Sequence, residues 1–342
     1  MDYYGRRLAT CSSDRTIKIF DVAGDDAAAT AANSQPTAIL TGCDKLTGLV
    51  HETCCGIEHA LSLSIQIRNQ KKNVFFFFFF FFFSSTHSLY LSHEGPVWQV
   101  AWLHPKFGNV LASCSYDRRV LIWKEDTPNQ WHVVYQYAEH ELSVNGLSWA
   151  PHTAGCRLAC ASSDGRLSVL SANAAGGWSA DAFAAHQIGV NCVAWAPHDF
   201  AAGAEPTQRL ASGGCDNLIK IWKFDAASSR WVCEHDLALH SDWVRDVAWA
   251  PRVGKERTLA SCAQDGVVVI WTQRADSEAW QPRVLPKFND VVWRVSWSLT
   301  GGILAVSGGD NKVTLWKEEA DGAWALLSTL DEQQQTTTPA AN

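Results

Sequence analysis

Short apolar runs recur along the chain, each bounded by Gly, Asn, Asp or Pro. In the clearest runs, two apolar segments rich in β-branched and aromatic residues flank one Asp, which predicts two β-strands joined by a tight turn. The Asp carboxylate can accept backbone N–H bonds in such a turn. Six copies follow one another: LATCSSDRTIKIF (8–20), LASCSYDRRVLIW (111–123), LACASSDGRLSVL (158–170), LASGGCDNLIKIW (210–222), LASCAQDGVVVIW (259–271) and LAVSGGDNKVTLW (304–316).

A second element precedes most of these copies and begins with His. A fifth element of this kind, FNDVVWRVSW (288–297), keeps the pattern without the His, and less regular strands such as WHVVYQY (131–137) and WALLSTL (324–330) complete the units. Four-stranded units of about 40 to 50 residues with this order of His, Asp and Trp predict an all-β fold, the WD-repeat β-propeller. The His-headed elements are HEGPVWQVAW (93–102), HELSVNGLSWAP (140–151), HQIGVNCVAWAP (186–197) and HSDWVRDVAWAP (240–251).

The spacing of the copies has one interruption. Their Asp residues lie at positions 14, 117, 164, 216, 265 and 310, so the first interval is 103 residues and the others are 45 to 52. Joining Gly42 to His93 gives LTGHEGPVW, which restores the Gly-His pair expected where a blade starts. We therefore predict a propeller formed by residues 1–42 and 93–330, with a 50-residue insertion, residues 43–92, in or after blade one.

The insertion differs from the rest of the chain in composition. It contains nine consecutive Phe, residues 75–83, and none of the 17 Trp. The codons of Gly42 and Ser92 permit splice signals at both boundaries, and the Phe codons supply a pyrimidine-rich tract, so we interpret the segment as a retained intron. A membrane-contacting loop and a low-complexity interaction loop are the alternatives. In each case the segment is expected to loop out of the first blade.

The recurring polar residues are predicted to form one buried hydrogen-bonded set in each blade. In the second copy the set is His93, Asp117, Ser113 and Trp123. A Ser/His/Asp catalytic site is the alternative, but these residues recur in several units and an enzyme needs its triad once. No catalytic, cofactor-binding or metal-ligating residue is predicted. The structural positions are His93, His140, His186, His240, Asp14, Asp117, Asp164, Asp216, Asp265, Asp310, Ser113, Ser212, Ser261, Trp123, Trp222, Trp271 and Trp316.

Composition and charge narrow the range of functions that the chain can have. Apolar residues make up 47% of the 342 residues and charged residues 18%, which excludes a disordered chain. The formal charge of −7 argues against direct binding of nucleic acid or an anionic membrane, so the expected partner is a protein. The N-terminus shows no secretory signal, and the longest apolar stretch has ten residues, whereas a spanning helix needs about 20.

The 11 Cys have no metal-site spacing. Five of them are interpreted as buried apolar residues in a reducing compartment: Cys11, Cys114, Cys160, Cys215 and Cys262.

Several longer blocks are more distinctive than the repeats. They are MDYYGRRLATCSSDRTIKIFDV, HEGPVWQVAW with FGNVLASCSYDR, ASGGCDNLIKIWK, HSDWVRDVAWAP, ASCAQDGVVVIWT, and FNDVVWRVSWS with LAVSGGDNKVTLWKE. Together these blocks resemble the Sec-thirteen family. The resemblance covers nearly all of residues 2–42 and 93–326 and is more specific than a generic WD repeat. Residues 43–92 have no counterpart in the family, and the tail 331–342 is expected to be disordered. The family usually has a further stretch before the DYYG block, so Met1 is interpreted as an internal Met chosen as the start.

This family supplies the small WD-repeat subunit of the coat protein complex II (COPII) outer cage and of the Y complex of the nuclear pore. The resemblance implies an open six-bladed propeller whose seventh blade comes from the large rod subunit of each assembly, and also a place in a TORC1-regulating complex. It implies localisation at the cytoplasmic side of the endoplasmic reticulum, on COPII vesicles and at the nuclear pore. Membrane association would occur only through the coat.

The repeats themselves agree with an open ring. The first of the six units lacks its His-headed strand, and the last ends with a fourth strand followed by the polar DEQQQTTTPAAN, so no terminal strand remains to close the ring. Unpaired edges favour aggregation unless a partner covers them, and strand addition is the natural means.

Three other functions compete with a scaffold. Substrate receptors of cullin ubiquitin ligases commonly carry Trp-Asp-x-Arg at a blade end, whereas Trp123, Trp222 and Trp316 precede Lys and Trp271 precedes Thr. A related open propeller of the same pore complex differs in the quoted blocks. An enzyme is the least favoured reading, because the polar sets repeat.

Overall fold

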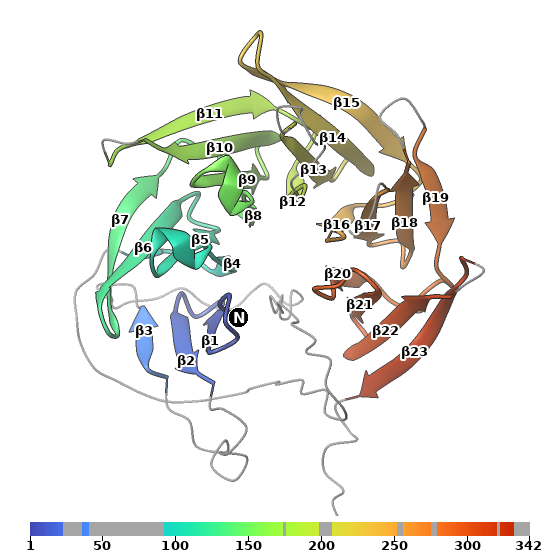
Figure 1. Ribbon diagram of the computed structural model, residues 1–342, viewed down its shortest axis with the longest axis horizontal. Helices are drawn as coiled ribbons and strands as arrows, with labels where there is room; N and C mark the ends of the chain where they lie inside the picture. Colours follow the sequence, from blue (N-terminus) through green and yellow to red (C-terminus); the bar gives the residue numbers. More distant parts are fainter. Residues whose placement is uncertain are drawn as a thin grey trace, which may run out of the picture.

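The chain folds into a ring of six antiparallel β-sheets, the blades of an open propeller (Figure 1). The computed structural model describes residues 1–22, 36–40, 92–173, 176–197, 207–251, 256–274, 279–319 and 322–331. Within these residues the only helical elements are two single 3-10 turns, η2 (Pro105–Phe107) and η3 (His152–Ala154). The predicted all-β, six-bladed fold is confirmed.

Blade one has three strands in the described residues, and every other blade has four. Its strands are β1 (Arg7–Cys11), β2 (Ile17–Asp21) and β3 (Ala38–Leu40), which occupy the three outer positions of a blade. This confirms that the first blade is incomplete. The insertion predicted at residues 43–92 lies outside the described residues except for Ser92.

Blades two to six each pair their strands in chain order, from the innermost strand at the ring centre outwards. Blade two contains β4 (Val97–Trp102), β5 (Val110–Ser115), β6 (Val120–Thr127) and β7 (Gln130–Tyr137). Blade three contains β8 (Val144–Trp149), β9 (Arg157–Ser162), β10 (Arg166–Ala172) and β11 (Trp178–Ala184). Blade four contains β12 (Val190–Trp195), β13 (Arg209–Gly214), β14 (Leu218–Asp225) and β15 (Arg230–Ala238). Blade five contains β16 (Val244–Trp249), β17 (Arg257–Ala263), β18 (Val268–Gln273) and β19 (Gln281–Val284), and blade six contains β20 (Val292–Trp297), β21 (Ile303–Gly308), β22 (Lys312–Glu318) and β23 (Trp324–Asp331).

The last strand is one residue longer than predicted. Asp331 pairs with Lys312 at the end of β23, so this residue belongs to the propeller and not to the tail. The rest of the predicted tail, residues 332–342, lies outside the described residues.

The innermost strands share one irregularity. Each runs for six residues from Val to Trp, and in each the register with the next strand shifts after the first residue. Such a shift is a β-bulge, which leaves one residue out of the ladder and re-aims its side chain. The bulged second residues are Trp98, Asn145, Asn191, Arg245 and Trp293.

The core lies between the blades. Alternation along each strand sends one set of apolar side chains to the preceding blade and the other set to the following blade. Five clusters each join two neighbouring blades, from blades one and two round to blades five and six. The sixth cluster, built on Ala305, Val313 and Leu315, contains residues of blade six alone. No such cluster joins blade six to blade one in the described residues, so the ring is open there.

Candidate interaction site: the polar sets and the open seam

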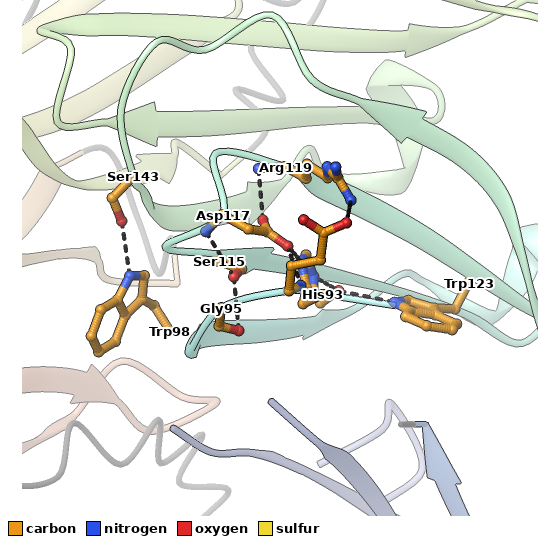
Figure 2. A network of polar contacts seen from close by, with 10 residues as sticks. His93, Gly95, Trp98, Ser115, Asp117, Arg119, Trp123 and Ser143 are labelled. Atoms are coloured by element: carbon orange, nitrogen blue, oxygen red, sulfur yellow. Dashed lines mark hydrogen bonds and ion pairs between the residues drawn. The ribbon is translucent and has the colours of Figure 1, made fainter. Parts of the chain in front are cut away.

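The predicted polar residues of blade two meet in one buried chain of hydrogen bonds. The Nδ1 atom of His93 lies 2.9 Å from Asp117 Oδ2, and its Nε2 atom lies 2.7 Å from Ser113 Oγ. The Trp123 indole N–H donates to the same Ser113 Oγ at 2.9 Å. Figure 2 shows His93 with Asp117 on one side and Trp123 on the other. The set thereby ties the start of the blade to its turn and its strands.

Blades four and five repeat this arrangement. In blade four, His186 contacts Asp216 and Ser212, each at 2.8 Å, and Trp222 donates to Ser212 at 2.9 Å. In blade five, the corresponding distances are 3.3 Å from His240 to Asp265, 2.9 Å from His240 to Ser261, and 3.0 Å from Trp271 to Ser261.

The direction of these bonds follows from what each partner can donate or accept. An ionised Asp only accepts, so Nδ1–H donates to it. The indole only donates, so the Ser hydroxyl accepts from Trp and keeps its own proton available for an unprotonated Nε2. Burial lowers the pKa of His186 and His240, and the nearby carboxylates of Asp216 and Asp265 offset this only in part.

Acid is therefore expected to destabilise the propeller from the usual histidine pKa downwards. Below pH 6.5 the unfolded chain protonates His186 and His240 more readily than the folded chain does, because their pKa is lower in the folded state, so the free energy of unfolding falls. The slope is at most about 1.4 kcal/mol per pH unit for each histidine. Urea unfolding between pH 5 and 8 measures this, and a His186→Asn variant should show a shallower slope. An equal slope in both proteins contradicts the assignment.

Blade three builds its set with a residue that the sequence analysis did not select. His140 contacts Asp164 at 2.8 Å, but its Nε2 atom meets Ser168 Oγ of β10 at 2.9 Å. Cys160 occupies the position that Ser113 holds in blade two, and Ser168 pairs with it in register. One sequence feature could have indicated this exchange. Ser168 interrupts the apolar run LSVL, at the position that Leu121 occupies in blade two.

The Ser168→Ala variant should lose about 1–3 kcal/mol of unfolding free energy, because the buried His140 Nε2 is left without a donor. Adding Cys160→Ser supplies a hydroxyl from the neighbouring strand and should restore part of this loss. Ser171→Ala, on the same strand but half-buried, serves as the control. Thermal and urea unfolding measure all three, and no recovery in the double variant would show that the hydroxyl position is not what matters.

The first and last blades have no complete set in the described residues. Asp14 is exposed and bonds only its own turn, where Thr16 N donates to it at 2.9 Å. Asp310 likewise accepts from Lys312 N at 3.1 Å. In blade six Phe288 replaces the His, its ring packs edge-on against Trp316, and the Trp316 N–H donates to Thr314 at 2.9 Å. The predicted positions Asp14, Asp310 and Trp316 are therefore not joined to a histidine.

The geometry of the complete sets resembles a catalytic triad but does not expose a nucleophile. Ser113, Ser212 and Ser261 are all 0% exposed, and each accepts the indole N–H of a Trp. A substrate cannot reach these hydroxyls. The described residues contain no group of His, Cys, Asp and Glu able to hold a metal ion, and none of their helices is long and apolar enough to cross a membrane. Of the five predicted core Cys, Cys114, Cys160 and Cys262 are buried, whereas Cys11 and Cys215 are only half-buried.

The opening of the ring, which we call the seam, is lined by two largely apolar faces. On blade six, Ala305, Val313 and Leu315 point away from blade five, and Leu330 packs against them. On blade one, Ala9, Ile17 and Ile19 pack on blade two, so their alternating neighbours point into the seam. These seam residues of blade one are Leu8, Thr10, Lys18, Phe20 and Ile39.

Exposure distinguishes the blade-one side of the seam from the closed junctions, whereas Ala305, Val313 and Leu315 on the blade-six side are buried. Leu111 and Trp123 of blade two, which correspond to Leu8 and Phe20, are 0% and 1% exposed because blade one covers them. Leu8 and Phe20 remain half-buried, and Ile39 is 48% exposed. The blade-one side of the seam thus presents the kind of surface that a neighbouring blade covers at the closed junctions.

Comparison with known proteins agrees with this architecture. The family described as "WD domain, G-beta repeat" matches residues 1–21, 83–124, 178–223, 231–272 and 282–317, together more than half of the chain. The chain is 43% identical to "Protein SEC13 homolog" of Drosophila melanogaster, over 96% of this chain and 79% of that protein. The chain belongs to the SEC13 family. Other SEC13 relatives include "Protein transport protein SEC13" of Mycosarcoma maydis, 39% identical over 97% of this chain and 91% of that protein, and "Protein transport protein sec13" of Emericella nidulans, 41% identical over 97% and 94%.

Proposed function

We propose that this SEC13-family chain is a non-enzymatic scaffold of protein transport that accepts a blade from a large rod subunit. The observation that carries the proposal is the seam, where largely apolar faces of blades six and one have no blade between them in the described residues. Its relatives named as protein transport proteins support the transport role. The buried serines support the absence of catalysis.

A sheet-forming partner fits the seam better than a small ligand. Every closed junction of the ring is filled by interdigitating side chains of two sheets, so a further sheet would extend the same packing into the seam. Strand addition also satisfies open sheet edges, which otherwise pair with other chains. A blade held on both faces would join the rod to the propeller with little freedom to bend.

The assemblies follow from the family resemblance. We propose the rod subunit of the COPII outer cage and that of the nuclear pore Y complex as the partners, and a TORC1-regulating complex as a further setting. The corresponding sites are the cytoplasmic side of the endoplasmic reticulum, COPII vesicles and the nuclear envelope. Contact with membranes would run through the coat, and no direct contact with nucleic acid is proposed.

Co-purification tests the proposal. The chain without residues 43–92 is expressed with the blade-donating segment of the COPII rod subunit, and a stable complex of one copy of each is expected on size-exclusion chromatography. A folded propeller that elutes without the segment would contradict the proposed partner. The Y-complex rod segment is tested in the same way.

A further inference from the structure

The second residue of each innermost strand reaches the next blade round the ring. Trp98 of blade two donates its indole N–H to Ser143 Oγ, just ahead of β8, at 2.9 Å, and Figure 2 shows this bond. Asn145 donates to Val190 O at 2.9 Å, and Asn191 donates to Val244 O at 2.8 Å. The β-bulge explains why these side chains leave their own sheet. The contact is thus a regular feature of the junctions.

The same position also links blades five and six. The Arg245 guanidinium lies over the Trp293 ring, 4.8 Å from its centre, and over Trp243 at 5.2 Å. Arg245 also hydrogen-bonds Gln264. Trp293 is itself the second residue of β20. The Arg245 guanidinium packs on one face of the Trp293 ring and holds it in place. In the described part of the chain the Trp293 indole N–H makes no hydrogen bond. The blade that would receive this bond is the next one round the ring, and that place is the seam.

The third residues of the innermost strands also reach the next blade, close to its own third residue. Gln99 accepts from the N–H of Leu147, the fourth residue of β8, at 2.8 Å, and Asp246 accepts from the N–H of Val295, the fourth residue of β20, at 3.1 Å. A side chain on Gly146 would lie 3.1 Å from the Cα atom of Cys192, which shows how closely the third residues approach.

Arg294, the third residue of β20, is the last member of this series. Its Nη1 atom lies 3.7 Å from Asp246 Oδ1, which is long for a direct hydrogen bond. Both Asp246 oxygens already accept backbone N–H groups, Val247 N at 3.0 Å and Val295 N at 3.1 Å. Arg294 can only donate, so it cannot accept a backbone N–H of the next strand as Gln99 and Asp246 do. On a strand that lay next to β20, an acceptor would therefore be its fitting partner.

We propose that Trp293 and Arg294 determine which blade the seam accepts. Trp293 donates to a hydroxyl or carbonyl just ahead of the first strand of the incoming blade, as Trp98 does to Ser143. Arg294 pairs with an Asp or Glu at the third residue of that strand, because third residues lie close together across a junction. This inference rests on the proposed function and adds the chemistry by which the rod subunit's blade is recognised.

The test measures the affinity of the full chain for the blade-donating segment of the rod subunit. Trp293→Phe keeps the ring against Arg245 and removes only the N–H donor, so the Kd should rise about fivefold to tenfold. Arg294→Gln removes the charge, so the Kd should rise about tenfold to a hundredfold and depend less steeply on salt. Trp98→Phe is the matched control, because it removes the same bond within the ring, and its Kd should not change.

A second variant separates recognition from stability. Asp246→Asn breaks the same internal ion pair as Arg294→Gln but leaves the Arg294 charge in place, so binding should be kept. Unchanged affinity and salt dependence in both Trp293→Phe and Arg294→Gln would overturn the inference, as would an equal loss of affinity in Asp246→Asn and Arg294→Gln. If the unaltered chain does not bind the segment at all, the proposed function fails instead.

Discussion

Replacing Trp123 with Ala is expected to lower the free energy of unfolding by about 3–5 kcal/mol, the range for removing a fully buried Trp. Trp123 is 1% exposed, packs between blades one and two, and donates to Ser113. Phe20 holds the same position in blade one but is half-buried and faces the seam. The Phe20→Ala variant should therefore cost only about 1 kcal/mol.

Urea unfolding followed by Trp fluorescence compares the two variants, and partner binding separates them further. Phe20→Ala should weaken binding of the rod segment at least about tenfold, because aromatic residues at the centre of an interface contribute disproportionately. Trp123→Ala should affect binding only through stability. Equal destabilisation by both variants would show that Phe20 is as well covered as Trp123 and that the seam is closed.

Deleting residues 43–92 is expected to raise the free energy of unfolding by about 3 kcal/mol. The deletion shortens the connection between Leu40 and His93 from 52 residues to two. Two residues also connect Tyr137 to His140, and a single residue connects Ala184 to His186. The shortened connection thus has the length that the intact junctions use, and a short connection loses less entropy on closure.

Urea unfolding of the chain with and without residues 43–92 measures this difference. A matched control removes residues 36–92, which also takes away β3 and with it Leu40, 7% exposed in the core between blades one and two. That control should be less stable than the shorter deletion. Loss of stability on removing residues 43–92 alone would show that they contribute to the fold and are not an insertion.

The strands and their order could be predicted from the sequence because their signal is local. Alternating apolar residues, an Asp turn and a terminal Trp recur in six copies, so β-strands such as β5 and β6 follow from a few neighbouring residues. The incomplete first blade followed from the same repeats.

The polar sets were predicted in part. The sequence pattern assumes that each set uses the same positions, which holds for Ser113, Ser212 and Ser261. In blade three the hydroxyl comes from Ser168 on the neighbouring strand. Either of two paired strands can supply the hydroxyl that meets the histidine. The choice depends on strand register and side-chain reach, which are properties of the folded sheet.

The contacts across the junctions could not be predicted from the sequence. They depend on a β-bulge at the second residue of each innermost strand, and nothing in an apolar run marks a bulge.

Photocrosslinking from the seam tests the central claim most directly. A photoreactive benzoylphenylalanine replaces Phe20, or Val232 as a control on the outer strand β15, where it is 50% exposed. After irradiation with the rod segment, we predict a crosslink from position 20 that maps to the donated blade, and none from position 232. A complex that forms without a crosslink at position 20, or that crosslinks from position 232 instead, would contradict the claim that the seam receives the blade.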